Sequence, residues 1–234
     1  MTMIEKEWAE RVRAAVATRT PLCLRGGGSK DFFGCTLAGE RFDLRANRGV
    51  VAYEPTELVV TVCAGTPLAE LEAVLADKGQ YLAFEPPHFG PGATVGGCVT
   101  AGLSGPRRAS AGAVRDFMLG VKLLDGRGEV LRFGGQVMKN VAGYDVSRLV
   151  AGSLGTLGIL LEVSLKVLPR PVAEATLRFE LDEASALRRV NEWGGQPLPV
   201  SATLWQHGVL HLRLSGAEAA VQAACARLGG EALD

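Results

Sequence analysis

The sequence has no run of apolar residues that approaches the roughly 18 needed to span a membrane. Its N-terminus is charged from Glu5 onward and lacks the apolar core of a signal peptide. The five cysteines are widely spaced and include no C-x-x-C pair, which argues against a disulfide framework and, with only three histidines, against a zinc site. We therefore expect no transmembrane segment, no metal and a cytoplasmic protein that meets the inner membrane face only through partners.

A strong charge of either sign is also missing, because 25 basic side chains balance 25 acidic ones. This balance gives no indication of a nucleic-acid-binding face. Glycine, by contrast, is abundant: 30 of the 234 residues are Gly, and 24 of these lie at or before Gly158. In that region we expect a backbone that turns tightly or approaches another group closely.

Hydrophobic periodicity predicts an α+β protein with a boundary near residues 168–172. Before the boundary, residues 86–112 are expected to form an ordered series of short turns, and Thr66 to cap a helix that has Pro67 at its first position. After it, a strand, a helix, a hairpin around His207-Gly208 and an Ala-rich helix form a small unit. The predicted helices are 3–17, 183–193 and 217–228, and the predicted strands are 21–25, 50–53, 58–63, 118–124, 129–133, 158–167, 175–181, 202–206 and 209–214.

Three glycine-rich segments carry the chemical information. In the first, Arg25-Gly-Gly-Gly-Ser29 follows a strand, and three glycines without side chains can turn several N–H groups toward one phosphate. A flexible loop is the alternative. The second segment, residues 86–102, combines prolines with small residues and suits a wall along an extended ligand or the close packing of two backbone layers. The third comprises residues 139–145 and the following LVAGSLGTLGI at 149–159.

In this order, the segments resemble the FAD-binding domain of the vanillyl-alcohol oxidase/p-cresol methylhydroxylase (PCMH) superfamily of FAD-linked oxidases. RGGGS corresponds to the loop that holds the FAD pyrophosphate, and ATVGG at 93–97 to the stretch that packs along the cofactor. AGAVRD at 111–116 stands for a Y-G-x-x-R-D-like element, and GSLGTLG at 152–158 for G-S-E-G-T-L-G. Within the superfamily, RGGGSKDFFG and KNVAGYDVSRLVAGSLGTLG look most like the FAD-binding subunits of glycolate oxidases.

The resemblance implies a two-subdomain PCMH-type FAD-binding domain over residues 1–170 and a shortened α+β cap over 171–234. FAD would be bound without a covalent link, because Ser29 stands where several relatives carry the tethering His. By this resemblance, the loop at Arg25 would contact the pyrophosphate, the ATVGG region would contact the ribityl chain and ring, and Gly158 would contact the adenine half. The implied cofactor-binding residues are Arg25, Gly26, Gly27, Gly28, Ser29, Pro86, Gly92, Ala93, Thr94, Val95, Gly96, Gly97, Thr100, Ala101, Gly112, Arg115, Asp116, Gly158 and Ile159.

No catalytic residue is assigned from the sequence. Leu154 stands where relatives carry Glu. Arg107, Arg108 and Arg115 are candidates for a cation that binds a substrate carboxylate, and His88 is the best candidate for a base, although a polar residue in a turn is the plainer interpretation. His207 and His211, four apart on an expected strand, would share one face, where a structural or surface role competes with one near the flavin.

Three functions remain open. The first is an FAD-binding subunit of a glycolate-oxidase-like complex that includes a larger flavin subunit and an iron–sulfur subunit and oxidises a small 2-hydroxy acid such as glycolate. The second is a self-sufficient FAD-dependent 2-hydroxy-acid oxidase or dehydrogenase. The third is a flavin-free scaffold.

Overall fold

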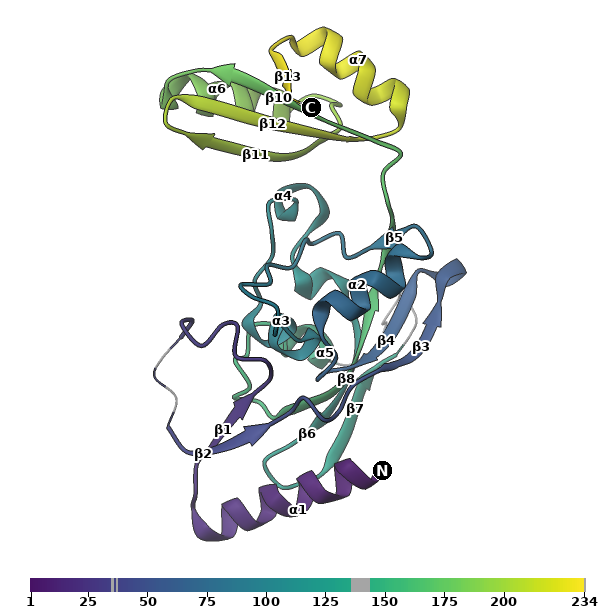
Figure 1. The fold of residues 1–234 in the computed structure, drawn as a ribbon, viewed down its shortest axis with the longest axis vertical. Coiled ribbons are helices and arrows are strands. Elements are labelled where there is room, and N and C mark those ends of the chain that lie inside the picture. Colours follow the sequence, from purple (N-terminus) through teal and green to yellow (C-terminus); the bar gives the residue numbers. More distant parts are fainter. Residues whose placement is uncertain (35, 37, 136–143, 234) are drawn as a thin grey trace. The chain divides into compact units, whose positions relative to one another are not determined.

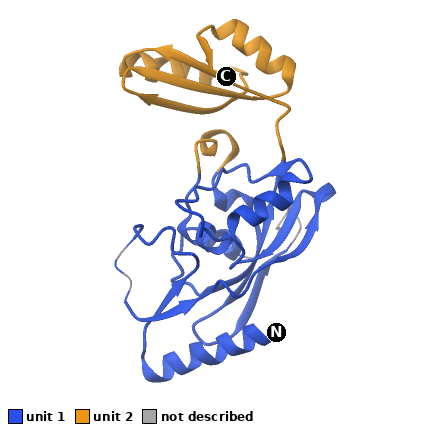
Figure 2. Ribbon diagram, viewed as in Figure 1, with its two compact units in different colours: residues 1–104, 113–168 blue, residues 105–112, 169–234 orange. Residues whose placement is uncertain are grey.

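The computed structural model describes residues 1–34, 36, 38–135 and 144–233. The chain divides into two compact units, coloured separately in Figure 2. The first comprises residues 1–104 and 113–168, and the second comprises residues 105–112 and 169–234. A short insertion from the first half of the sequence is therefore part of the second unit.

The first unit mixes helices with a five-stranded antiparallel sheet whose strand order is β3-β4-β8-β6-β7, and it adds a separate parallel pair, β1-β2 (Figure 1). Its elements are α1 (Met3–Thr18), β1 (Leu22–Arg25), β2 (Glu40–Asp43), β3 (Val50–Glu54), the 3₁₀-helix η1 (Pro55–Glu57), β4 (Val59–Cys63), α2 (Leu68–Ala76), β5 (Gln80–Tyr81), α3 (Val95–Ala101), the 3₁₀-helix η2 (Val114–Phe117), β6 (Met118–Leu124), β7 (Val130–Gly134), α5 (Val146–Leu149) and β8 (Ile159–Lys166). The short strand β9 (Leu168–Pro169) lies at the join of the units.

Helix α1 confirms the expected N-terminal helix. Thr2 and Glu5 form a capping box at its start: the Thr2 hydroxyl accepts from the Glu5 N–H at 3.3 Å, and the Glu5 carboxylate accepts from the Thr2 N–H at 2.9 Å. Trp8 and its buried neighbours pack against Phe42 of β2, with the two rings edge-to-face at 5.6 Å. The helix thus covers the region where β2, β6 and β8 approach one another.

A buried charge cluster ties α1 to the sheet. Lys122 of β6 donates to the carboxylate of Glu5 and, at 2.9 Å, to that of Glu162 on β8. The side chains of Glu5 and Lys122 are 3% and 7% exposed. Burial by itself raises the pKa of Glu5, but the hydrogen bonds from Lys122 and Thr2 together with the Lys122 charge lower it overall. Lys122 therefore couples three elements far apart in sequence.

Two local predictions for the first unit are wrong. Thr66 does not cap α2: Pro67 occupies the N-cap position, and the Thr66 hydroxyl instead accepts from the Gly49 N–H at 2.9 Å. The stretch 86–112 is not made of turns alone, because it contains α3, whose N-cap Thr94 accepts from the Gly97 N–H at 3.2 Å and whose C-cap Gly102 has a φ of 68°. Tertiary packing overrides the low helix propensity of its two glycines.

The second unit confirms the order of elements expected after residue 172 and adds a final strand. Its elements are α4 (Arg108–Ala111), β10 (Ala173–Glu180), α6 (Glu183–Gly194), β11 (Val200–Gln206), β12 (Val209–Gly216), α7 (Glu218–Leu228) and β13 (Glu231–Leu233). The antiparallel sheet has the order β11-β12-β10-β13. Leu177, Leu210 and Leu212 form its buried core with Trp193 of α6 and Val221 of α7.

The insertion belongs to this unit because polar contacts fix it to the sheet. The buried Arg107 guanidinium donates to Glu174 at 3.1 Å and to Ser215 at 2.9 Å, and the Ser110 hydroxyl donates to the Ser201 carbonyl at 3.1 Å. Within the described part of the chain, the helices are all too short or too polar to cross a bilayer.

Candidate functional site

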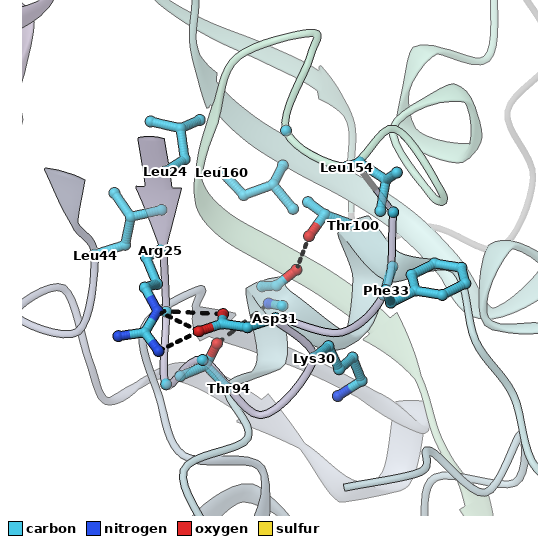
Figure 3. Close-up of a pocket in the computed structure, with 18 of the residues that line it drawn as sticks. Leu24, Arg25, Lys30, Asp31, Phe33, Leu44, Thr94, Thr100, Leu154 and Leu160 are labelled. Atoms are coloured by element: carbon cyan, nitrogen blue, oxygen red, sulfur yellow. Dashed lines mark hydrogen bonds and ion pairs between the residues drawn. The ribbon is translucent and has the colours of Figure 1, made fainter. Parts of the chain in front are cut away.

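A pocket of ≈ 420 Å³ lies in the first unit, beside the end of β1 (Figure 3). Its walls come from the glycine loop after β1, from α3, and from the loop that leads into β8. This volume lies within the range of about 300–1,000 Å³ usual for ligand pockets. The described residues that line it are Leu24, Arg25, Gly26, Gly27, Gly28, Ser29, Lys30, Asp31, Phe33, Gly34, Thr36, Ala38, Leu44, Ala64, Thr94, Gly96, Gly97, Thr100, Ala101, Leu154, Gly155, Thr156, Gly158, Ile159 and Leu160.

The glycine loop is packed so tightly that side chains cannot be added. A Cβ on Gly27 would lie 1.4 Å from the carbonyl oxygen of Gly92, and one on Gly26 would lie 2.4 Å from the Thr94 hydroxyl. Gly28 has a φ of 75°, which favours glycine. The loop and the second segment are therefore two backbone layers in direct contact. The close packing of two backbone layers expected for the second segment is present at Gly92, which packs against Gly27, while Thr94 and Gly96 line the pocket.

The backbone donors of the loop lie in a segment that lines the pocket. Within the described residues, none accepts a hydrogen bond from the backbone N–H groups of residues 26–30. Consecutive N–H groups without acceptors, in a loop that includes a positive φ at Gly28, are typical of a nest that binds an anion. The arrangement therefore favours a phosphate or diphosphate over a neutral group.

The side chain of Arg25 stabilises this loop from within. Its Nε lies 3.0 Å from Oδ2 and 3.2 Å from Oδ1 of Asp31, and its Nη2 also donates to that carboxylate (Figure 3). A Cβ on Gly28 would lie 2.1 Å from Nη2, so the guanidinium lies directly against the loop backbone. The hydrogen bonds from Arg25 hold the pKa of Asp31 below its usual range. The two charges neutralise each other and hold the ends of the loop together.

The second wall is held by short hydrogen bonds around α3. The Gly96 N–H donates to the Ala64 carbonyl at 2.7 Å, and a Cβ on Gly96 would lie 2.8 Å from the Cβ of Ala64. The Thr100 hydroxyl donates to the Gly96 carbonyl at 2.9 Å (Figure 3). Small residues thus bring α3 against the end of β4 and leave one surface of the helix open to the pocket.

The third wall joins α3 to the strand β8. The N–H groups of Gly152 and Leu154 donate to the carbonyls of Val99 and Thr100, at 3.0 and 2.9 Å. Leu154 itself has a φ of 52°. Leu24, Leu44 and Leu160 also line the pocket, and with Leu154 they give it an apolar portion (Figure 3). The walls therefore combine a loop suited to an anion with an apolar portion.

The structure brings together twelve of the nineteen site residues inferred from the sequence: Arg25, Gly26, Gly27, Gly28, Ser29, Thr94, Gly96, Gly97, Thr100, Ala101, Gly158 and Ile159 line the pocket. The other seven do not. Pro86, Ala93 and Val95 are buried, Gly92 packs against Gly27, and Gly112 belongs to the second unit. The Asp116 carboxylate caps η2 by accepting from the Ala113 N–H at 2.9 Å, and Arg115 is exposed.

The catalytic candidates named from the sequence do not line the pocket. His88 does not line the pocket, and its Nε2 lies 2.9 Å from Oε2 of Glu72. The contacts of Arg107 hold it in the second unit. His207 and His211 do not share a strand face, because His207 lies in the turn between β11 and β12 with a φ of 49°. Most of the segment 139–145 lies outside the described residues.

Several pocket residues were not found from the sequence. Lys30 and Asp31 adjoin the recognised glycines, and their position alone could have signalled them. Leu24 and Leu44, labelled in Figure 3, come from the ends of β1 and β2. Strand β2 has no clear alternation of polar and apolar residues. Leu154 and Thr156 lie in the GSLGTLG segment, in which the resemblance implied only Gly158 as a cofactor-binding residue.

The fold and the pocket define a nucleotide-cofactor-binding domain, and comparison with known proteins makes the assignment specific. The model of the family described as "FAD binding domain" matches residues 4–134, more than half of the chain. The chain therefore belongs to the FAD-binding-domain family, and FAD is its cofactor.

Similar proteins include oxidoreductases and their subunits. The chain is 51% identical over 222 residues to the glycolate oxidase subunit GlcE of Escherichia coli (strain K12), an alignment that covers 95% of this chain and 63% of that protein. It is 30% identical over 161 residues to the glycolate oxidase subunit GlcD of Bacillus subtilis (strain 168), with 68% of this chain and 34% of that protein covered. The mitochondrial D-lactate dehydrogenase [cytochrome] of Arabidopsis thaliana is 30% identical over 206 residues, with 76% and 36% covered. The chain thus spans less than two thirds of the length of each.

Among solved structures, an alkyldihydroxyacetonephosphate synthase matches 94% of this chain and 47% of its own with a TM-score of 0.72 at 19% identity. This likeness, with the family match, confirms the predicted α+β fold with a PCMH-type FAD-binding domain. The pocket fits the cofactor on physical grounds too, since a loop without side chains presents N–H groups that lack described acceptors.

Proposed function

We propose that this chain is a non-covalent FAD-binding subunit of a glycolate-oxidase-type complex that oxidises a small 2-hydroxy acid. The observation that carries the proposal is the 51% identity over 95% of the chain to a glycolate oxidase subunit. We further propose that residues 1–170 form the FAD-binding domain and residues 171–234 a shortened cap. The partners would be a larger flavin subunit and an iron–sulfur subunit on the cytoplasmic side of the inner membrane.

In this proposal the residues of the chain bind and orient the cofactor. The N–H groups of residues 26–30 hold the diphosphate, and Ser29 adds a hydroxyl but no covalent bond. Thr94, Gly96 and Thr100 line the pocket beside the loop, and Ile159 and Leu160 contribute to its apolar portion. Bound FAD supplies the two-electron acceptor, while the protein positions it.

The same residues explain why catalysis is proposed for the complex rather than for the chain alone. Among the described residues, the charged side chains that line the pocket are Arg25, Lys30 and Asp31, and no histidine or glutamate lines it. Arg25 holds the Asp31 carboxylate, so the described lining offers no unpaired carboxylate and no histidine to act as a base for the substrate hydroxyl. A partner subunit that completes the site would supply it.

Purification with added FAD, followed by absorbance spectroscopy before and after addition of glycolate or D-lactate, tests the proposal. We expect a yellow protein whose flavin absorbance is not bleached by the chain alone and is bleached once the flavin and iron–sulfur partners are added. Bleaching by the chain alone would instead establish a self-sufficient dehydrogenase. A colourless protein that does not bind added FAD would support the third function, a flavin-free scaffold.

A further inference from the structure

The pocket's charge balance singles out one side chain. Of the three charged residues that line it, Arg25 and Asp31 pair with each other through the hydrogen bonds described above. Their charges cancel, and the guanidinium is committed to the loop backbone at Gly28. Lys30 is therefore the source of net positive charge among the pocket residues that the structure describes.

Lys30 is partly buried and has no anionic partner in the described part of the chain. Its Nζ lies 5.8 Å from the centre of the Phe89 ring. Cys98 of α3 lies nearby, and burial raises the pKa of that thiol to about 12, so it remains uncharged. Glu72 of α2 is engaged by His88 at 2.9 Å. Burial lowers the pKa of Lys30, as is usual for an ammonium group withdrawn from water without a counter-charge.

Lys30 belongs to the same loop segment as the N–H groups that lack described acceptors. Residue 30 lines the pocket, and it has both a backbone N–H without a described acceptor and a cationic side chain. The N–H groups carry only partial charges, whereas a diphosphate carries whole negative charges. An unpaired cation on the same segment meets that need, and a bound anion would relieve the desolvation of the ammonium.

We propose that Lys30 provides the positive charge that recognises the diphosphate of FAD, while Arg25 and Asp31 act only as a clip that shapes the loop. This inference rests on the proposed function to the extent that FAD occupies the pocket. It adds a specificity residue outside the glycine motif. It also divides the two cations of the loop into one that binds the ligand and one that positions the backbone.

The test measures the dissociation constants of FAD, ADP and adenosine for the full chain by calorimetry. Lys30→Met removes the charge and keeps most of the length, Lys30→Arg keeps the charge, and Lys78→Met changes an exposed lysine outside the pocket. We expect Lys30→Met to weaken FAD and ADP binding about ten- to a hundredfold, the usual effect of losing a charge-assisted hydrogen bond. We expect Lys30→Arg to restore most of that loss, Lys78→Met to change nothing, and adenosine binding to be equal in all four proteins.

Raising the salt concentration gives a second readout that a merely structural role would not change. Screening should weaken ADP binding to the wild type more than to Lys30→Met. Thermal unfolding of each variant without ligand provides the check on folding, and the restored affinity of Lys30→Arg guards against misreading a folding defect.

The contrary outcomes distinguish failure of the proposed function from failure of the role of Lys30. A wild type that binds neither FAD nor ADP would overturn the proposed function itself. A wild type that binds both, with Lys30→Met equal to it, would overturn only the role of Lys30. Loss of FAD affinity without loss of ADP affinity would also overturn it, because the charge would then serve another part of the cofactor. Equal loss of ADP and adenosine affinity would reduce Lys30 to a packing role.

Discussion

Gly27→Ala is the substitution whose effect the structure specifies most closely. The added Cβ would lie 1.4 Å from the carbonyl oxygen of Gly92 and 2.3 Å from its carbonyl carbon. Real Cβ contacts stay beyond 3.0 Å, so the two backbone layers must separate by roughly 1.5 Å. Overpacking of this kind costs about 1–3 kcal/mol. If the cost falls on the FAD-competent loop, it corresponds to about 5- to 150-fold weaker binding.

The position of the steric clash determines which properties of the Gly27→Ala variant change. A side chain at Gly27 could be excluded either by a bound phosphate or by the protein itself. In the structure the first obstacle is the protein's own backbone at Gly92, so the loop is displaced before any ligand arrives. We therefore expect a lower melting temperature of the ligand-free protein as well as weaker FAD binding.

Flavin fluorescence quenching and thermal unfolding measure the two effects. Gly126→Ala is the matched control, because a Cβ at Gly126 meets nothing within 4 Å and its φ is not positive. We expect that control to behave as the wild type. Wild-type FAD affinity in Gly27→Ala would refute the argument that contact between the two glycine layers shapes the site.

The remaining predictions concern buried groups. Cys98→Ala should retain FAD at nearly wild-type affinity, since small size matters at that buried position; the native thiol, whose pKa burial raises to about 12, should not react with a thiol reagent until the protein unfolds. Lys122→Met should lower the free energy of unfolding by about 3–5 kcal/mol in urea titrations, because it leaves the buried Glu5 carboxylate without the Lys122 ammonium; an unchanged midpoint would contradict this. The pKa of Glu5 is lowered from its ordinary 4.5, so its stabilising contribution is present above that pH and is lost as the pH falls through the lower folded value. The melting temperature of Glu5→Gln should accordingly fall less steeply than that of the wild type below about pH 4.5, and parallel curves would count against the assignment.

Periodic segments were predictable, and elements that depend on tertiary contacts were not. Strand β8 alternates apolar residues with Glu162, Ser164 and Lys166, α1 has an amphipathic pattern, and both lie within a residue or two of the expected bounds. Helix α3 was missed because Gly96 and Gly97 disfavour a helix; the close approach of Gly96 to Ala64 requires those glycines. Strand β2 depends on parallel pairing with β1 across a long connection, which leaves no local pattern.

At the candidate site, too, residues with a local sequence signal could be predicted, and residues placed by tertiary contacts could not. The motif glycines could be recognised because the close contacts at residues 26–28, with the Thr94 side chain, the Gly92 backbone and the Arg25 side chain, leave no room for a Cβ. Lys30 and Leu154 were missed as pocket residues because their role depends on where their side chains lie in the fold. Gly112 was wrongly assigned to the FAD-binding domain because residues 105–112 belong to the second unit. No change in composition marks this boundary in the sequence.

The most direct test of the account is a crystal structure of the full chain with ADP or FAD bound. We predict diphosphate oxygens within hydrogen-bonding distance of the N–H groups of residues 26–30, with the Arg25–Asp31 pair intact and the ammonium of Lys30 directed at the phosphates. A diphosphate bound elsewhere, or a loop whose N–H groups face other protein atoms in the complex, would contradict the central claim that this side-chain-free loop is the cofactor's anion site.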